Sequence, residues 1–211
     1  MPRLPFLRLM NELELAQLVL AAERKECPEG GIYYDHGPLR VIRLGEVLAI
    51  AGSHNIWDWI QNINWLPSPM TGFGRVHRGW LYAANALKSW GKADGVKIIT
   101  GHSYGAPVAL ILGVLMYPTE PDIRVVQFSP PSCGDRQFCK NVKFPVKRIW
   151  LSPDLVTWLY PFYGRVGDPT SLKGTFNFYR NHSMANIVSA LGIKKRPDLT
   201  LLKSDQADML G

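Results

Sequence analysis

Apolar and polar residues alternate along the start of the chain in two different periods. In residues 11–25, leucine, valine and alanine recur at helical spacing among Glu and Gln, which predicts an amphipathic helix. Residues 39–43 and 47–51 are short apolar runs separated by Leu44-Gly45-Glu46. This second pattern predicts a pair of strands.

From residue 79 onward the pattern predicts alternating helices and strands. Residues 79–90 have apolar side chains at helical spacing, with Trp80 and Trp90 expected on the packed face. The next elements are a β-branched strand, a helix that is apolar on all sides and two further strands, at residues 96–100, 106–116, 124–129 and 148–152. Such alternation predicts an α/β fold with a mostly parallel central sheet flanked by helices.

Length and composition narrow the class of protein. The 211 residues contain no repeat or long linker, so we expect a single domain over residues 1–211. Charged residues make up only 19% of the chain and hydrophobic residues 46%, which excludes a disordered chain. Three cysteines are too few for a disulfide scaffold, and no Cys or His spacing is typical of zinc, so we expect no metal site.

The net charge of +7 does not by itself indicate a partner. Basic residues are scattered, and the small clusters at 140–148 and 194–196 are typical of solvated surface, so we do not expect nucleic-acid binding. No apolar run approaches the roughly 20 residues of a membrane span, and the N-terminus lacks the apolar core of a signal peptide. We therefore expect a cytoplasmic protein.

A motif typical of a nucleophile lies between the strand at 96–100 and the helix at 106–116. Gly101, Ser103 and Gly105 form a G-x-S-x-G pattern, whose glycines suit a strand-to-helix turn too tight for side chains. Such a turn lifts the serine hydroxyl above the sheet and points a helix N-terminus at it, which stabilises negative charge. The pattern predicts a nucleophilic serine; the alternative is a structural turn without chemistry.

A serine nucleophile needs a general base, and chain order selects one here. Where a serine occupies this kind of turn, the order along the chain is Ser, then acid, then His. Of the five histidines, only His182 follows Ser103, so His182 is the predicted base. The alternative interpretation is a histidine on a surface loop.

The acid must lie between these two residues. The candidates are Glu120, Asp122, Asp135, Asp154 and Asp168. The first two lie in a turn expected at the far end of the sheet. Asp154 directly follows the strand at 148–152, and sites in parallel sheets form at the carboxyl ends of strands, so Asp154 is the best candidate. Asp135 and Asp168 remain alternatives.

Several segments resemble the class 3 lipases, the fungal triacylglycerol lipase type of α/β-hydrolase. The resemblance covers roughly residues 39–187, and its motifs lie at residues 52–59, 76–80, 101–105, 128–135 and 148–161. The last of these is similar to the acid-bearing segment of the family, R-x-x-N-x-x-D-x-V-P, and its acid falls on Asp154. The resemblance implies an α/β-hydrolase fold with a catalytic triad of Ser103, Asp154 and His182.

The same resemblance implies an oxyanion hole and a lid. The family's serine after the glycine of the first motif maps onto Ser53, and the backbone N–H of Tyr104 would be the second donor. The lid is predicted over about residues 54–69, with Ile56, Trp57, Trp59 and Ile60 contacting substrate. Part of this stretch has helical spacing and also fits a core face. However, its excess of apolar residues favours a flap facing a lipid interface.

These patterns predict a serine carboxylic-ester hydrolase, a lipase or esterase that cleaves acyl lipid esters through an acyl-enzyme without a cofactor. Its expected partners are an acyl lipid or ester substrate and, transiently, a membrane or lipid interface. Departures from the family pattern at Ala51, Ala106 and Ala185 support an alternative, a hydrolase-fold protein that binds lipid or membrane without catalysis. Phospholipase and soluble-ester esterase activities also stay open.

Overall fold

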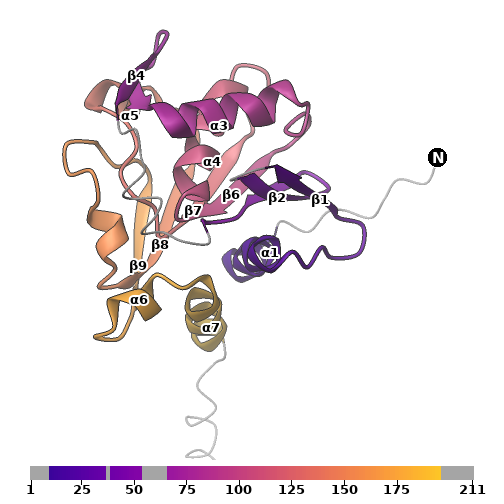
Figure 1. Ribbon diagram of the computed structural model, residues 1–211, viewed down its shortest axis with the longest axis vertical. Coiled ribbons are helices and arrows are strands. Elements are labelled where there is room, and N and C mark those ends of the chain that lie inside the picture. The colour runs from indigo at the N-terminus through magenta and orange to yellow at the C-terminus, as the bar shows by residue number, and fades with distance from the viewer. Residues whose placement is uncertain (1–9, 37–38, 54–65, 196–211) are drawn as a thin grey trace, which may run out of the picture.

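A seven-stranded sheet forms the centre of the structure, a computed structural model that describes residues 10–36, 39–53 and 66–195 (Figure 1). Its strands are β1 (Ile32–His36), β2 (Leu39–Leu44), β3 (Val47–Ile50), β6 (Ile98–His102), β7 (Arg124–Phe128), β8 (Val146–Ser152) and β9 (Asp168–Lys173). They lie side by side in that order. The first three pair antiparallel, and β3 to β9 pair parallel. The predicted α/β fold with a mostly parallel sheet is confirmed.

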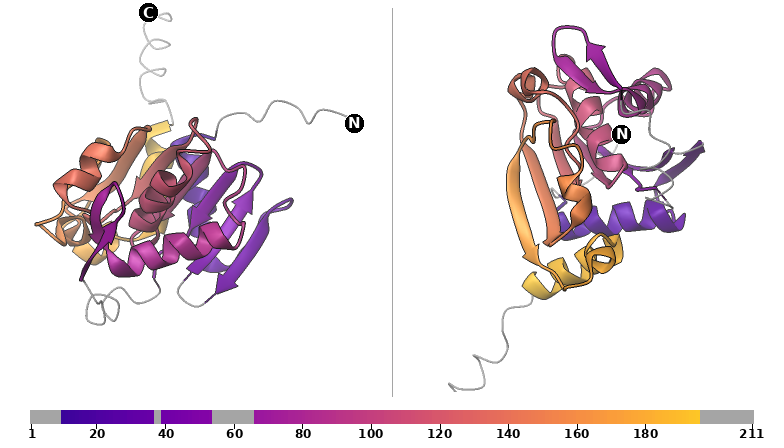
Figure 2. Two further views of the ribbon diagram at one scale, coloured as in Figure 1. Left: turned by 90° about the horizontal axis from the view of Figure 1, so that it is seen from above. Right: turned by 60° about the vertical axis from the view of Figure 1, so that its left-hand side comes forward.

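Helices cover both faces of this sheet. On one face, α1 (Glu12–Arg24) packs beside α7 (Met184–Lys195), and on the other, α3 (Arg78–Ser89) packs against α4 (Gly105–Met116) (Figures 1 and 2). Three short helical segments lie after β7, β8 and β9: α5 (Arg136–Asn141), the 3-10 helix η1 (Leu155–Trp158) and α6 (Phe178–Asn181). Each face of the sheet therefore has its own apolar core.

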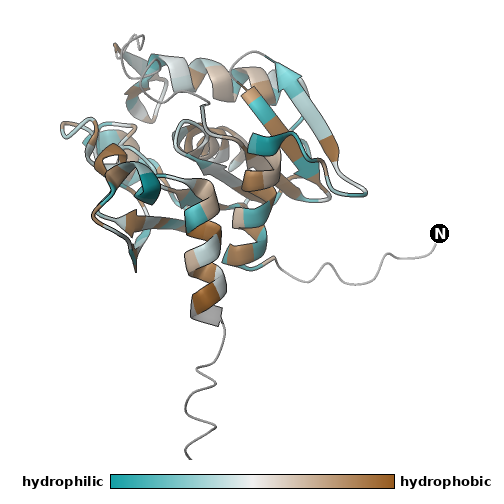
Figure 3. Cartoon of the chain, turned by 60° about the horizontal axis from the view of Figure 1, so that its bottom comes forward, coloured by the Kyte–Doolittle hydropathy of each residue, from teal (hydrophilic) through white to brown (hydrophobic). Residues whose placement is uncertain are grey.

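Helix α1 is amphipathic, as its sequence pattern predicts. Asn11 caps its start, because the Asn11 side chain accepts hydrogen bonds from the N–H groups of Leu13 and Glu14, and Glu14 accepts the Asn11 N–H in return. Figure 3 shows the side of the molecule formed by α1 and α7, with hydrophobic and hydrophilic residues mixed along both helices. The buried residues of α1 are Leu15, Ala16, Leu18, Val19 and Ala22.

Helix α4 is apolar on every side because other parts of the chain surround it. All of its residues except Leu115 are buried, since it lies in contact with the strands on one side and α3 on the other. The buried helix predicted at residues 106–116 is thus confirmed. Neither α4 nor any other helix within residues 10–36, 39–53 and 66–195 is long and apolar enough to cross a membrane.

The local structure differs from the sequence expectations at two places. Residues 67–69, at the end of the predicted lid segment, belong to β4 (Pro67–Met70), which forms a hairpin with β5 (Gly74–His77). Prolines fit there because β4 pairs only with β5 in the described structure, leaving an edge that needs no N–H donors. Trp90 is 39% exposed rather than packed, because α3 ends at Ser89 and the Trp90 ring turns edge-on to His36.

Candidate active site

Ser103 occupies the sharp turn between β6 and α4. Its φ of 51° is in the left-handed region, which is strained for serine, and its N–H donates to the Phe128 carbonyl of β7 (3.0 Å). A Cβ on Gly101 would collide with the backbone of Gly105, and one on Gly105 with the backbone of Ile50. The glycines of the G-x-S-x-G pattern are therefore required by space, as the sequence predicts.

Ser103, His182 and Asp154 form one continuous chain of hydrogen bonds. Ser103 Oγ lies 2.9 Å from His182 Nε2. Nδ1 of the same ring lies 3.1 and 2.9 Å from Oδ1 and Oδ2 of Asp154. The Asp154 carboxylate is 1% exposed and also accepts the N–H of Val156 at the start of η1. With Nδ1–H directed at the carboxylate, Nε2 is left to accept the serine proton.

The topology of the sheet brings these three side chains together. Strands β6 to β9 are parallel, so their carboxyl ends lie at the same end of the sheet. Ser103 follows β6, Asp154 follows β8, and His182 comes after β9 at the end of α6. The three predicted residues, far apart in the chain, therefore meet at one place.

Asn181 joins the segments that carry the acid and the base. Its side-chain amide donates to the carbonyls of Pro153 (2.6 Å) and Thr175 (2.7 Å), and its side-chain oxygen accepts the Thr175 N–H (2.8 Å). Only 1% of Asn181 is exposed. Sequence reasoning missed this residue, and its place directly before His182 was the one available signal.

The environment of His182 sets its protonation. Burial lowers the pKa of His182, the hydrogen bond with Asp154 opposes this, and the positive charge of the neighbouring His102 lowers the pKa again. The net result is a pKa below the ordinary 6.5. His182 is therefore neutral at pH 7, which is the form a general base needs.

The other candidate acids lie away from His182. Asp168 begins β9 and pairs with Lys147 near the start of β8, so it lies at the amino ends of the strands, opposite to Asp154. Asp135 caps α5 and accepts the N–H groups of Phe138 and Arg75. Glu120 and Asp122 precede β7, also at the amino ends of the strands. Among these five carboxylates, Asp154 is the one that contacts His182.

The two predicted oxyanion donors follow the ends of neighbouring strands, Ser53 after β3 and Tyr104 after β6. Ile50 at the end of β3 pairs with Gly101 in β6, so the segments leading to Ser53 and Ser103 leave the sheet side by side. Tyr104 directly follows Ser103 and is the N-cap residue of α4. These positions are compatible with two N–H groups near the serine hydroxyl, and the oxyanion role stays a prediction.

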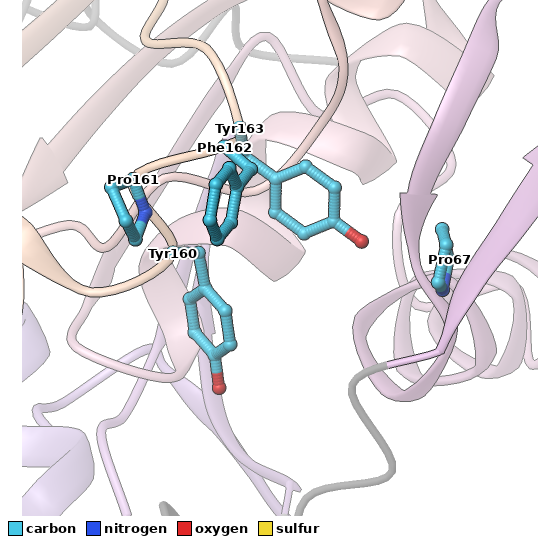
Figure 4. A pocket seen from close by; sticks show the side chains of 5 residues that line it. All are labelled: Pro67, Tyr160, Pro161, Phe162 and Tyr163. Carbon is cyan, nitrogen blue, oxygen red and sulfur yellow. The ribbon is translucent and has the colours of Figure 1, made fainter.

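An apolar pocket of about 360 Å³ lies beside the segment that carries Asp154. Pro67 lines one side of it and residues 160–163 the other, and the Tyr163 ring extends toward Pro67 across the gap (Figure 4). The Tyr160 ring packs edge-on against the ring of the buried Trp80. The triad residues do not line this pocket, which begins two residues after η1.

The predicted lid and the expected absence of a metal site both stay predictions. The predicted lid residues Ile56, Trp57, Trp59 and Ile60 lie outside the described residues, so the lid stays a prediction. In the described ranges, no group of three or more His, Cys, Asp or Glu side chains is placed to hold a metal ion.

Comparison with known proteins establishes the family. Residues 47–163 match the sequence profile of the family described as lipase (class 3), which includes Ser103 and Asp154 and ends before His182. The match spans more than half of the chain, and the protein belongs to the class 3 lipase family. Among curated proteins, no sequence matches significantly.

Solved structures of fungal lipases share the fold at low sequence identity. Lipase II from Rhizopus niveus is 19% identical with a TM-score of 0.60, over 77% of this chain and 80% of that one. The Rhizomucor miehei lipase in a propeptide complex is also 19% identical with a TM-score of 0.60, over 78% and 68% of the two chains. A triacylglycerol lipase from Penicillium expansum is 17% identical with a TM-score of 0.54, over 76% and 78%. The α/β-hydrolase fold is thereby confirmed.

Proposed function

We propose that this protein is a serine carboxylic-ester hydrolase that cleaves acyl lipid esters, with Ser103, His182 and Asp154 as its catalytic triad. The observation that carries the proposal is the hydrogen-bond chain from Ser103 Oγ through the His182 ring to Asp154. Membership of the class 3 lipase family supports an ester as the substrate.

The geometry supports acyl transfer in two steps. Ser103 Oγ attacks the ester carbonyl carbon while His182 Nε2 takes its proton, and Asp154 stabilises the imidazolium that forms. Collapse of the tetrahedral intermediate expels the alcohol, which receives the proton from His182. Water then attacks the acyl-enzyme with His182 again as the base, releasing the carboxylic acid and restoring Ser103.

The backbone N–H groups of Tyr104 and Ser53 are the proposed donors to the oxyanion. Tyr104 is positioned for this by the start of α4, where the helix dipole stabilises negative charge. Each donor of this kind typically contributes about 2.7–4 kcal/mol to transition-state stabilisation.

Apolar surface in the chain segments that follow Asp154 and flank His182 supports an acyl lipid as the substrate. The pocket between Pro67 and residues 160–163 is apolar. Several large apolar side chains near Asp154 and His182 in the chain are also exposed: Leu155, Trp158, Phe162, Phe176 and Tyr179. Such surface favours contact with acyl chains or a lipid interface over a strongly polar substrate.

Covalent labelling tests the nucleophile directly. A fluorophosphonate probe should label the wild-type protein, label His182→Ala only weakly and fail to label Ser103→Ala. Ser89→Ala, which changes an exposed serine at the end of α3, is the matched control and should label fully. A folded wild-type protein that binds lipid vesicles but neither reacts with the probe nor hydrolyses esters would instead support the non-catalytic lipid-binding alternative.

A substrate series tests the lipid part of the proposal. We expect hydrolysis of long-chain esters to rise steeply once the substrate exceeds its solubility limit and forms an interface. A rate that stays proportional to dissolved substrate, with preference for short acyl chains, would identify a soluble-ester esterase.

A further inference from the structure

A second histidine, His102, lies next to the proposed catalytic histidine, His182. It is the residue before Ser103, and only 7% of its side chain is exposed. His102 Nδ1 lies 2.6 Å from Glu23 Oε1 in α1, and Nε2 lies 2.8 Å from the main-chain carbonyl oxygen of His182. The rings of His102 and His182 are tilted by 35°, with their centroids 4.9 Å apart.

Both nitrogens of His102 face hydrogen-bond acceptors, and this arrangement determines the charge of the ring. A carboxylate and a carbonyl oxygen can only accept, so satisfying both requires an N–H on each nitrogen, which is the imidazolium form. Burial lowers the pKa of His102, but the charge and hydrogen bond of Glu23, with smaller contributions from Asp154 and the His182 carbonyl, raise it above the ordinary value. Glu23 and His102 therefore form a mostly buried ion pair.

Glu23 also contacts the segment that leads to Ser53. Its Oε1 accepts the N–H of Gly52 (3.2 Å), and a Cβ on Gly52 would lie only 2.8 Å from His102 Nδ1. The buried Arg40 donates 2.6 Å hydrogen bonds to the carbonyls of Gly52 and Glu23. Burial raises the pKa of Glu23, but His102, the Gly52 N–H and Arg40 together outweigh burial and lower this pKa below its ordinary value, so the carboxylate is charged.

We propose that Glu23 and His102 are positioning residues for the hydrolase. Their ion pair fixes the main chain of His182 and of Gly52 in one buried network, and the cationic ring beside His182 favours the neutral form of the base. This inference rests on the proposed function and extends it to two residues outside the triad. Within the described residues, the charged or titratable groups that face this network are Asp154 after β8, Arg40 in β2 and the two histidines themselves.

The charge of the network separates this role from simple packing. In Glu23→Gln the side chain keeps its size and an acceptor oxygen, but His102 loses the anion that stabilises its positive charge. The variant thus removes the His102 cation, which lowers the pKa of His182, together with the smaller opposing effect of the Glu23 charge, so the acid limb of the pH profile should move to higher pH. A residue that only supports the fold would change stability without moving this limb.

Steady-state kinetics on a soluble ester measure the effect. We expect Glu23→Gln to lower kcat about tenfold with little change in KM, because misplaced catalytic groups slow the chemical step. The acid limb of the pH profile of Glu23→Gln should shift to higher pH by about one unit. Glu23→Asp, which keeps the charge, should restore the position of the acid limb, and Glu26→Gln, the same change at an exposed position three residues further on, should match wild type.

NMR of ¹⁵N-labelled histidine tests the inference even if no ester is hydrolysed. We expect both nitrogens of His102 to be protonated at pH 7, and His182 to titrate at higher pH in Glu23→Gln than in wild type. A neutral His102 at pH 7, or the same His182 titration in both proteins, would overturn the proposal. Absence of hydrolysis and of probe labelling in wild type would overturn the proposed function alone.

Discussion

Two regions of the molecule differ in how far their side chains are exposed. One is the α1 side of the triad, and the other comprises the segments near Asp154 and His182 in the chain. On the α1 side, His102 and Arg40 are buried, and each makes hydrogen bonds to the main chain. In the other region, Phe162 and Phe176 are almost fully exposed, and Trp158 is 69% exposed. Figure 1 shows α1 and the segment after β8 well apart.

This difference has a physical explanation. Buried charges are tolerated only when partners surround them, so the α1 side must hold one arrangement. Exposed aromatic side chains contribute little to folding, but they offer apolar area to a ligand. One region therefore fixes the geometry of the proposed triad, and the other is available to an apolar substrate.

The largest effect is expected from Asp154, which belongs to the fixed geometry. In Asp154→Asn the amide no longer stabilises the imidazolium of His182, so kcat should fall by about 10⁴-fold while the fold is retained. Ester hydrolysis and thermal unfolding measure the two quantities. Asp168→Asn, an exposed change at the amino ends of the strands, is the control, and a comparable loss of activity there would contradict the assignment of the acid.

Asn181 tests whether the fixed geometry extends beyond the triad. Asn181→Ala leaves the Pro153 carbonyl and the Thr175 N–H without their present partner, so the free energy of unfolding should fall by about 2 kcal/mol. The kcat should fall about tenfold, because Asp154 and His182 lose the residue that joins their segments. Denaturant unfolding and kinetics measure both. Asn85→Ala, an exposed change in α3, should leave both unchanged.

The pH dependence of wild-type activity tests the environment of His182 without a mutation. The pKa of His182 lies below 6.5, and protonation removes the base, so activity is lost only as the pH falls through that lowered pKa. We expect kcat/KM at pH 6.5 to stay above half of its plateau value. A half-maximal value reached above pH 6.5 would show that Asp154 outweighs burial and His102.

The smallest effect is expected from the exposed aromatic residues. The double variant Phe162→Ser/Phe176→Ser should hydrolyse emulsified ester a few-fold more slowly, because it offers less apolar area to the interface. Hydrolysis of a dissolved short-chain ester should not change, and stability should stay within about 0.5 kcal/mol. Tyr82→Ser, an exposed aromatic change in α3, is the matched control. Equal losses on both substrates would assign these residues to the active site itself.

Much of the central fold could be predicted from apolar periodicity. The helix at α1, the buried helix α4 and the inner strands all have patterns that follow directly from burial on one side or on all sides. The edge strands β1 and β9 were missed because their residues are largely exposed and show no apolar run. The hairpin of β4 and β5 was missed because prolines at its edge conceal a strand pattern.

The amino-acid sequence by itself determined the turn at Ser103 and the choice of His182. The turn lies within five consecutive residues: Gly101 leaves space for the backbone of Gly105, and Gly105 leaves space for the backbone of Ile50 at the end of β3. Only the tertiary structure decided that Asp154 reaches His182, that Asn181 joins their segments and that Glu23 pairs with His102. Those contacts join elements distant in the chain, and they depend on strand order, register and helix packing, which no local pattern of residues records.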